Sequence, residues 1–140
     1  MSDVIRESAS SRPEDRVLLI GHGSKDGSNS RTVEALAEVL RRDRMDVSCC
    51  YNEFEGPGIE EALASMGGGS DILAVPVFVS PSFHSETEVP TRLGVDGSTR
   101  TGIFGGCRIR YAREIGLNQA MGNVLLAMLE DLGVTGMHWA

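Results

Sequence analysis

The chain has 140 residues, of which 41% are hydrophobic and only 5% aromatic, and it carries a formal net charge of −7. This length suits one domain with a sizeable core. The acidic balance argues against generic nucleic-acid binding and against binding to anionic membranes, since both need a basic surface, and no apolar run is long enough to span a bilayer.

The N-terminal segment, residues 1–15, is polar and of mixed charge, without the apolar stretch of a signal peptide. We expect it to be a flexible leader, followed by a single α/β domain over residues 16–140. Three cysteines without a secretory signal predict a protein of the reducing cytoplasm. Cys49 and Cys50 are adjacent in an expected strand and point to opposite faces, which favours small core residues over a thiolate metal site.

Short apolar runs alternate with segments of helical periodicity along the domain, which is the pattern of βαβ units. The apolar runs predict strands over residues 17–20, 45–52, 72–79 and 107–112. The periodic segments predict helices over residues 28–42, 59–66 and 117–132. The last helix carries an apolar stripe, and by default such a stripe is expected to pack in the core.

Two connections have less regular patterns. Residues 81–90 begin and end with proline and include His84 and two glutamates, and we expect a short helical turn there. Residues 96–106 are rich in Gly, Ser and Thr, which predicts a mobile loop. Such a loop beside His84 is either a flap that brings Arg100 to a bound ligand or an idle surface connection, as loops of this composition usually are.

These elements predict an α/β fold: a single-domain, flavodoxin-like sandwich with a four-stranded, mainly parallel sheet and helices on both faces. Right-handed crossovers favour the strand order 2-1-3-4. In this order the chain reverses its direction of winding between strands 1 and 3, so a crevice opens there at the carboxyl ends of the strands.

Potential metal ligands follow three of the expected strands. His22 follows the first strand, His84 lies a few residues beyond the third, and Glu53 ends the second. Each alone is more often an ordinary loop residue, but together at one edge they indicate a His-Glu-His cluster. Nitrogen and oxygen donors of this kind suit Co, Ni, Fe or Zn better than Mg or Ca, and an imidazole also serves as a base near neutral pH.

Several familiar motifs are absent. The turn after the first strand lacks both the Gly-Lys-Ser/Thr ending of a P-loop and the glycine spacing of a dinucleotide site. No Cys-x-x-Cys follows His84, and the sequence contains neither His-Glu-x-x-His nor Gly-x-Ser-x-Gly. The glycines around His22 instead allow a bulky flat ligand to approach the backbone closely.

Several stretches resemble the small CbiX-type chelatases, the single-domain sirohydrochlorin cobaltochelatases related to the siroheme ferrochelatases. They are Leu-Leu-Ile-Gly-His-Gly-Ser at 18–24, Asn-Glu-Phe at 52–54 before Pro57, Val-Pro-Val-Phe-Val at 75–79 through His84 to Val-Pro at 89–90, and Tyr-Ala at 111–112. The resemblance covers residues 17–132. The chain departs from it where Arg-Glu at 113–114 replaces the usual Glu-Pro.

The resemblance implies a chelatase-like fold and an ATP-independent class II chelatase that inserts Co²⁺ into sirohydrochlorin in cobalamin-type biosynthesis. His22, His84 and Glu53 are then the catalytic and metal-binding residues. The residues expected to contact the tetrapyrrole are Gly23, Ser24, Ser80 and Arg100. A homodimer is expected, with no cofactor besides the metal that is inserted.

Two other functions stay open at this point. The same ligands suit Fe²⁺, Ni²⁺ or Zn²⁺, so the protein is alternatively a ferro- or nickel-chelatase acting on the same substrate. The second alternative is a protein that binds the metal or the tetrapyrrole but does not catalyse insertion.

Overall fold

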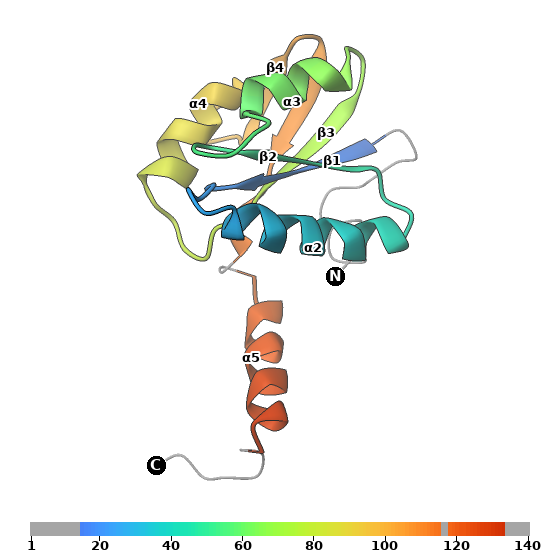
Figure 1. The fold of residues 1–140 in the computed structure, drawn as a ribbon. Helices are drawn as coiled ribbons and strands as arrows, with labels where there is room; N and C mark the ends of the chain where they lie inside the picture. The colour runs from blue at the N-terminus through green and yellow to red at the C-terminus, as the bar shows by residue number, and fades with distance from the viewer. Residues whose placement is uncertain (1–14, 116–117, 134–140) are drawn as a thin grey trace.

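The computed structural model describes residues 15–115 and 118–133. Along the chain the elements are β1 (Asp15–Gly21), α2 (Ser28–Arg42), β2 (Val47–Tyr51), α3 (Ile59–Met66), β3 (Asp71–Pro76), the π-helical segment η1 (His84–Glu88), α4 (Val89–Leu93), β4 (Thr101–Phe104), β5 (Cys107–Tyr111) and α5 (Ala120–Asp131). The domain folds as an α/β unit (Figure 1). The expected leader, apart from Asp15, lies outside the described residues.

One mixed sheet forms the centre, with the order β2-β1-β3-β5-β4. The pairs β1–β2, β1–β3 and β3–β5 are parallel, and β4 pairs with β5 in the antiparallel direction. The predicted strands therefore lie in the predicted order, with residues 107–112 supplying β5. Their parallel direction places the carboxyl ends of β1, β2 and β3 at one edge.

The sheet has five strands, and the predicted count of four is wrong. The added strand, β4, lies within residues 96–106, which were expected to be a loop. Gly105 and Gly106 both have positive φ, at 57° and 83°, and connect β4 to β5 as a two-residue hairpin turn. At Gly102 a Cβ atom would lie 2.1 Å from the carbonyl oxygen of Gly94, so the glycines permit a close-packed strand here.

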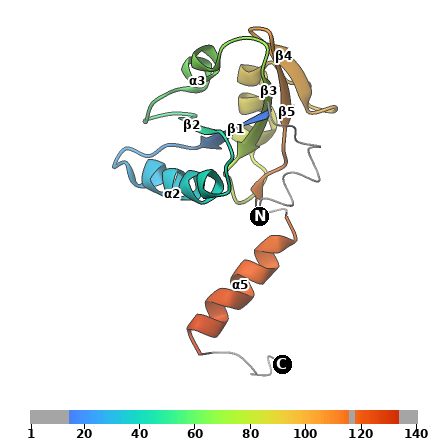
Figure 2. The same cartoon turned by 90° about the vertical axis from the view of Figure 1, so that its right-hand side faces the viewer.

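Side chains alternate along β1 between two apolar clusters, as the pleat of a central strand requires. Val17 and Leu19 pack with residues of α2 on one face. Leu18 and Ile20 pack on the other face with residues of α3 and α4, including Leu63. Figure 2 shows α2 on one side of the sheet, and α3 on the other. The predicted helices on both faces are confirmed.

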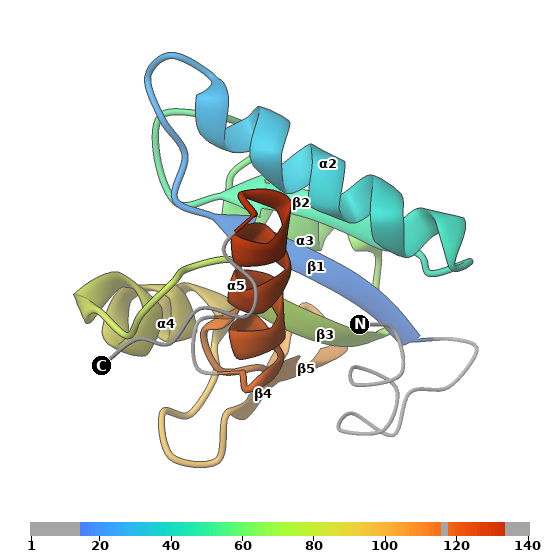
Figure 3. The same ribbon diagram turned by 90° about the horizontal axis from the view of Figure 1, so that it is seen from below.

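Helix α5 projects away from the sheet (Figures 1 and 2), and in the view from below it therefore lies in front of the sheet (Figure 3). None of its residues is buried, so the expectation that its apolar stripe packs in the core is wrong for these residues of the single chain. Its exposed apolar side chains are Val124, Leu125, Leu126, Met128 and Leu129, with Leu132 just beyond. Among the described residues, no helix is both long and apolar enough to cross a membrane.

Candidate metal-handling site

The two histidines predicted to act together meet at the carboxyl edge of the sheet. His22 directly follows β1, and its ring stacks on Phe78 with the ring centroids 4.0 Å apart. His84 begins η1, and its ring meets that of His22 edge to face at 5.3 Å between centroids. Phe78 is 2% exposed and gives His22 a rigid support. Two imidazoles from different segments therefore share one half-buried position.

The loop after β2 packs closely on the turn that carries His22. The amide of Glu53 donates a hydrogen bond to the carbonyl oxygen of His22 at 3.0 Å. A Cβ atom at Gly23 would lie 1.7 Å from the carbonyl oxygen of Glu53, and Gly23 has φ +86°. Only glycine fits a left-handed backbone at such a distance. Gly23 therefore has a structural role, and its predicted contact with the tetrapyrrole stays a prediction.

The third predicted ligand, Glu53, has an exposed side chain. Over residues 15–115 and 118–133, no three side chains of His, Cys, Asp or Glu are grouped closely enough to hold a metal ion. Glu53 still affects the site, because its charge acts to raise the pKa of His22. Its role as a ligand stays a prediction.

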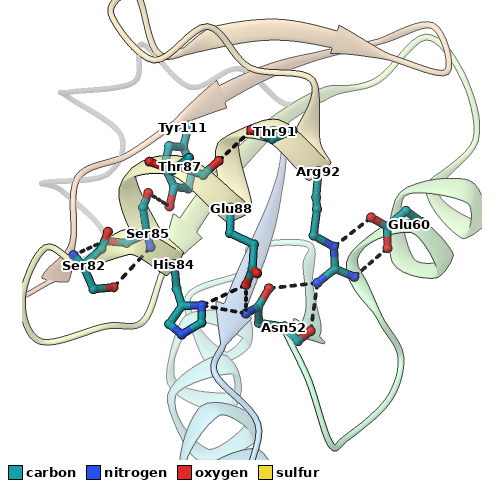
Figure 4. Close-up of polar contacts among 10 residues, drawn as sticks. All are labelled: Asn52, Glu60, Ser82, His84, Ser85, Thr87, Glu88, Thr91, Arg92 and Tyr111. Atoms are coloured by element: carbon teal, nitrogen blue, oxygen red, sulfur yellow. Dashed lines mark hydrogen bonds and ion pairs between the residues drawn. The ribbon is translucent and has the colours of Figure 1, made fainter.

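A carboxylate that sequence analysis did not assign contacts His84 directly. Oε1 of Glu88 lies 2.8 Å from Nδ1 of His84, one turn earlier in η1. The side-chain amide of Asn52 also donates to Oε1 of Glu88. Figure 4 shows these side chains converging from η1 and from the loop after β2. The four-residue spacing of His84 and Glu88 between two prolines was a usable signal for this pair.

Electrostatics favour one neutral imidazole and one ionised carboxylate. Burial lowers the pKa of His22 below its usual 6.5, and the neighbouring charge of His84 lowers it further, against the opposing charges of Glu53 and Glu88. Hydrogen bonds from Asn52 and then from His84 lower the pKa of Glu88. At neutral pH His22 therefore has a free lone pair, as a metal ligand or proton acceptor requires.

The remaining predicted contact residues lie around this edge. The Ser24 hydroxyl accepts from the amide of Asn29 at 3.0 Å and is held inside its turn. Ser80 is exposed after β3. Arg100 donates to the carbonyl oxygens of Tyr111 and Ala112, at 3.1 and 2.7 Å, and its guanidinium lies over the Tyr111 ring. Arg100 thus packs on β5, and substrate contact by these three residues stays a prediction.

The cysteines are all free and buried, as expected for small core residues. Burial raises the pKa of Cys49 and of Cys50 to about 12. Neither is therefore a thiolate at neutral pH, and thiolate is the form that binds metals.

Comparison with known proteins identifies relatives along nearly the whole domain. The CbiX family model matches residues 16–132. A sirohydrochlorin cobaltochelatase of Methanosarcina acetivorans is 29% identical over 122 residues, covering 82% of this chain and 94% of that protein. Another sirohydrochlorin cobaltochelatase, from Saccharolobus islandicus, is 31% identical over 114 residues, covering 79% of this chain and 89% of that protein.

Solved structures share the fold. A cobalamin (vitamin B12) biosynthesis CbiX protein of Marinobacter aquaeolei superposes with a TM-score of 0.67 at 23% identity, covering 84% of this chain and 96% of that one. SirB from Bacillus subtilis with Fe³⁺ gives a TM-score of 0.61 at 24% identity, covering 86% of this chain and 48% of that one. With a family match over residues 16–132 and two histidines at the edge of a chelatase-like sheet, the chain belongs to the CbiX family.

Proposed function

We propose that the protein inserts Co²⁺ into sirohydrochlorin without ATP. The observation that carries the proposal is the pair of imidazoles, His22 and His84, whose rings meet at 5.3 Å at the carboxyl edge of the sheet. The names of the relatives support the choice of metal and ring, since several are sirohydrochlorin cobaltochelatases.

The chemistry of metal insertion matches what these residues offer. The ion must lose bound water, and two pyrrole N–H protons must leave the ring. If Nδ1 of His84 donates to Glu88, then Nε2 has its lone pair free for the ion. His22, neutral because burial lowers its pKa, supplies a second nitrogen or accepts a pyrrole proton. Glu53, exposed beside His22, is proposed to orient the ion or pass on a proton.

The assay mixes purified protein with sirohydrochlorin and Co²⁺ in the absence of ATP and follows the absorption spectrum of the ring. Several turnovers per protein support an enzyme, whereas one stoichiometric change supports a carrier. Parallel reactions with Fe²⁺, Ni²⁺ and Zn²⁺ rank the metals, and a faster rate with Fe²⁺ or Ni²⁺ than with Co²⁺ would overturn the choice of cobalt.

Substitution of the two imidazoles tests the site itself. His22→Ala and His84→Ala should each abolish insertion while the circular dichroism spectrum stays that of the wild type, because both residues lie on segments outside the core. His138→Ala, which changes the third histidine of the chain, is the matched control. Activity within a few-fold of wild type in either site variant would contradict the assignment.

We also infer a homodimer, because one copy leaves two apolar surfaces uncovered. One is the exposed apolar side of α5. The other is a hollow of about 60 Å³ beside α2, lined only by Leu19, Leu36, Val39, Leu40, Val75, Val77 and Ile115. A broad planar tetrapyrrole is also larger than one small domain covers. Groups of exposed apolar side chains are typical of association sites.

Light scattering on the purified protein tests the dimer. Twice the monomer mass is expected for the wild type, and the monomer mass for Leu125→Glu, since a charge cannot be buried unpaired in an apolar contact. A wild-type monomer at working concentration would contradict the inference. We further propose a cytoplasmic location, supported by three buried cysteines that remain free thiols, and cell fractionation checks it.

A further inference from the structure

Polar side chains from four segments form a continuous chain of hydrogen bonds behind His84 (Figure 4). It runs from Glu60 on α3 through Arg92 on α4 and Asn52 after β2 to Glu88 on η1. We propose that Asn52, Arg92 and Glu88 are positioning residues that hold the His84 ring in the orientation and tautomer needed to pass a divalent ion to the tetrapyrrole. This inference rests on the proposed function.

The first link lies within the π-helical turn η1. The amide of Val89 donates to the carbonyl oxygen of His84, five residues earlier, which widens the turn. Glu88 then lies on the same side of the turn as His84, with its carboxylate 2.8 Å from Nδ1. A carboxylate on the second ring nitrogen is one of the usual partners that orient a metal-binding imidazole.

The second link follows from the hydrogen-bonding capacity of each group. The Arg92 guanidinium has only donors, and its Nη1 lies 2.8 Å from both the carbonyl oxygen and Oδ1 of Asn52. The amide of Asn52 must therefore turn its oxygen to Arg92 and its nitrogen to Glu88. An ionised Glu88 has only acceptors, so it accepts from Asn52 and also from Nδ1 of His84.

This arrangement determines the tautomer of His84. The amide nitrogen of Asn52 lies 3.4 Å from Nδ1, farther than the 2.8 Å between Nδ1 and Glu88. The shorter contact is satisfied only if Nδ1 has the proton and donates it to Glu88. Nε2 is then the nitrogen with the free lone pair, and it faces away from the hydrogen-bond chain.

The far end of the chain is held by a two-point ion pair. Nε and Nη2 of Arg92 donate to the two carboxylate oxygens of Glu60, at 2.8 and 2.6 Å. Two parallel bonds fix the plane of the guanidinium, which a lysine cannot reproduce. The orientation of Asn52 is thereby set from α3 and α4, at a distance from the imidazole.

A double-mutant cycle tests the proposal, with two measurements on each variant. The first is kcat and KM for sirohydrochlorin with saturating Co²⁺. The second is the affinity of the protein alone for Co²⁺, from the visible absorption of the bound ion. Glu88→Ala should lower kcat or Co²⁺ affinity by about 10–100-fold, the usual effect of removing such a partner, with little change in KM. Glu88→Asp should recover part of the loss.

In the wild-type background, Asn52→Leu should lower kcat or Co²⁺ affinity by a smaller factor than Glu88→Ala does. In the Glu88→Ala background, Asn52→Leu should cause no further loss of either quantity. Arg92→Met and Arg92→Lys should lower kcat or Co²⁺ affinity by about the same factor as Asn52→Leu. Arg108→Met is the matched control, because it removes the exposed partner of an ion pair with Asp71 on another part of the sheet, and it should leave every value unchanged.

Independent, additive losses from Asn52→Leu and Glu88→Ala would overturn the proposal, because they would mean that Asn52 does not act through Glu88. Wild-type values in Glu88→Ala would overturn it as well. If the wild type shows no turnover, the proposed function fails, and the Co²⁺ affinities alone then decide the positioning role.

Discussion

Gly23 lies where the turn after β1 meets the backbone of the loop after β2, and its replacement by alanine separates two halves of the site. A Cβ atom there would lie 1.7 Å from the carbonyl oxygen of Glu53, whereas real contacts of this type are not shorter than 3.0 Å. Because packed atoms do not interpenetrate, the two segments must move apart by about 1.3 Å. The movement strains the bond from the Glu53 amide to His22 and the bond from the Asn52 amide to Gly21.

The cost has two parts. A non-glycine residue at φ +86° costs about 1–2 kcal/mol, and two weakened backbone hydrogen bonds cost about 1–3 kcal/mol together. We expect Gly23→Ala to lower the free energy of unfolding by about 2–5 kcal/mol. Insertion of Co²⁺ should slow by about 100-fold, the effect of a misplacement of this size at a reacting centre.

Urea unfolding and the insertion assay measure the two effects. Gly27→Ala is the matched control, since Gly27 also has positive φ, at +77°, but its Cβ would meet no atom closer than 3.5 Å. The Gly27→Ala variant should lose only the stability that a non-glycine residue costs at positive φ. If Gly23→Ala were no less stable and no less active than Gly27→Ala, the close approach to Glu53 would not matter, and the reasoning would be refuted.

Other predictions concern titration and stability. The pKa of His22 in the folded protein should lie below 6.5 and should rise in His84→Ala, as measured by NMR titration, because one of the charges that lower it is removed. Since the unfolded chain then takes up a proton near pH 6.5 before the folded protein does, His22 should make stability fall as the pH drops below 6.5 and have no effect above it; a flat profile in the His22→Ala difference would contradict this. Glu114 is 1% exposed, and within the described part of the chain neither carboxylate oxygen has a hydrogen-bond partner, so Glu114→Gln should raise the free energy of unfolding by about 1 kcal/mol in urea titration, and a loss would contradict this. Arg100→Met should lower it by about 1–3 kcal/mol, because its bonds to the carbonyls of Tyr111 and Ala112 are lost; an unchanged midpoint would show that these bonds contribute nothing.

Much of the fold was predictable because its signals are local. The helices over 28–42 and 59–66 were predicted with the bounds that the structure has, since apolar spacing and flanking glycines define them within the segment itself. The order of the parallel strands followed from the handedness of crossovers. The meeting of His22 and His84 followed in turn, because the carboxyl ends of parallel strands share one edge. The strand β4 also had a usable local signal, since the Gly105–Gly106 pair is typical of a hairpin turn. The Gly, Ser and Thr content of residues 96–106 made the whole segment look like a loop instead.

The rest depends on contacts between segments that are distant in the chain. Glu53 ends a strand and was assigned from that position, yet it is Glu88 that contacts an imidazole, because the helical turn of η1 places it four residues after His84 on the same side. Asn52 gains a role only when Arg92, 40 residues later, turns its amide. The apolar stripe of α5 predicts that one face of the helix is buried, but it does not identify the surface that covers this face. Periodicity describes one helix alone, whereas its partner is decided by tertiary or quaternary packing.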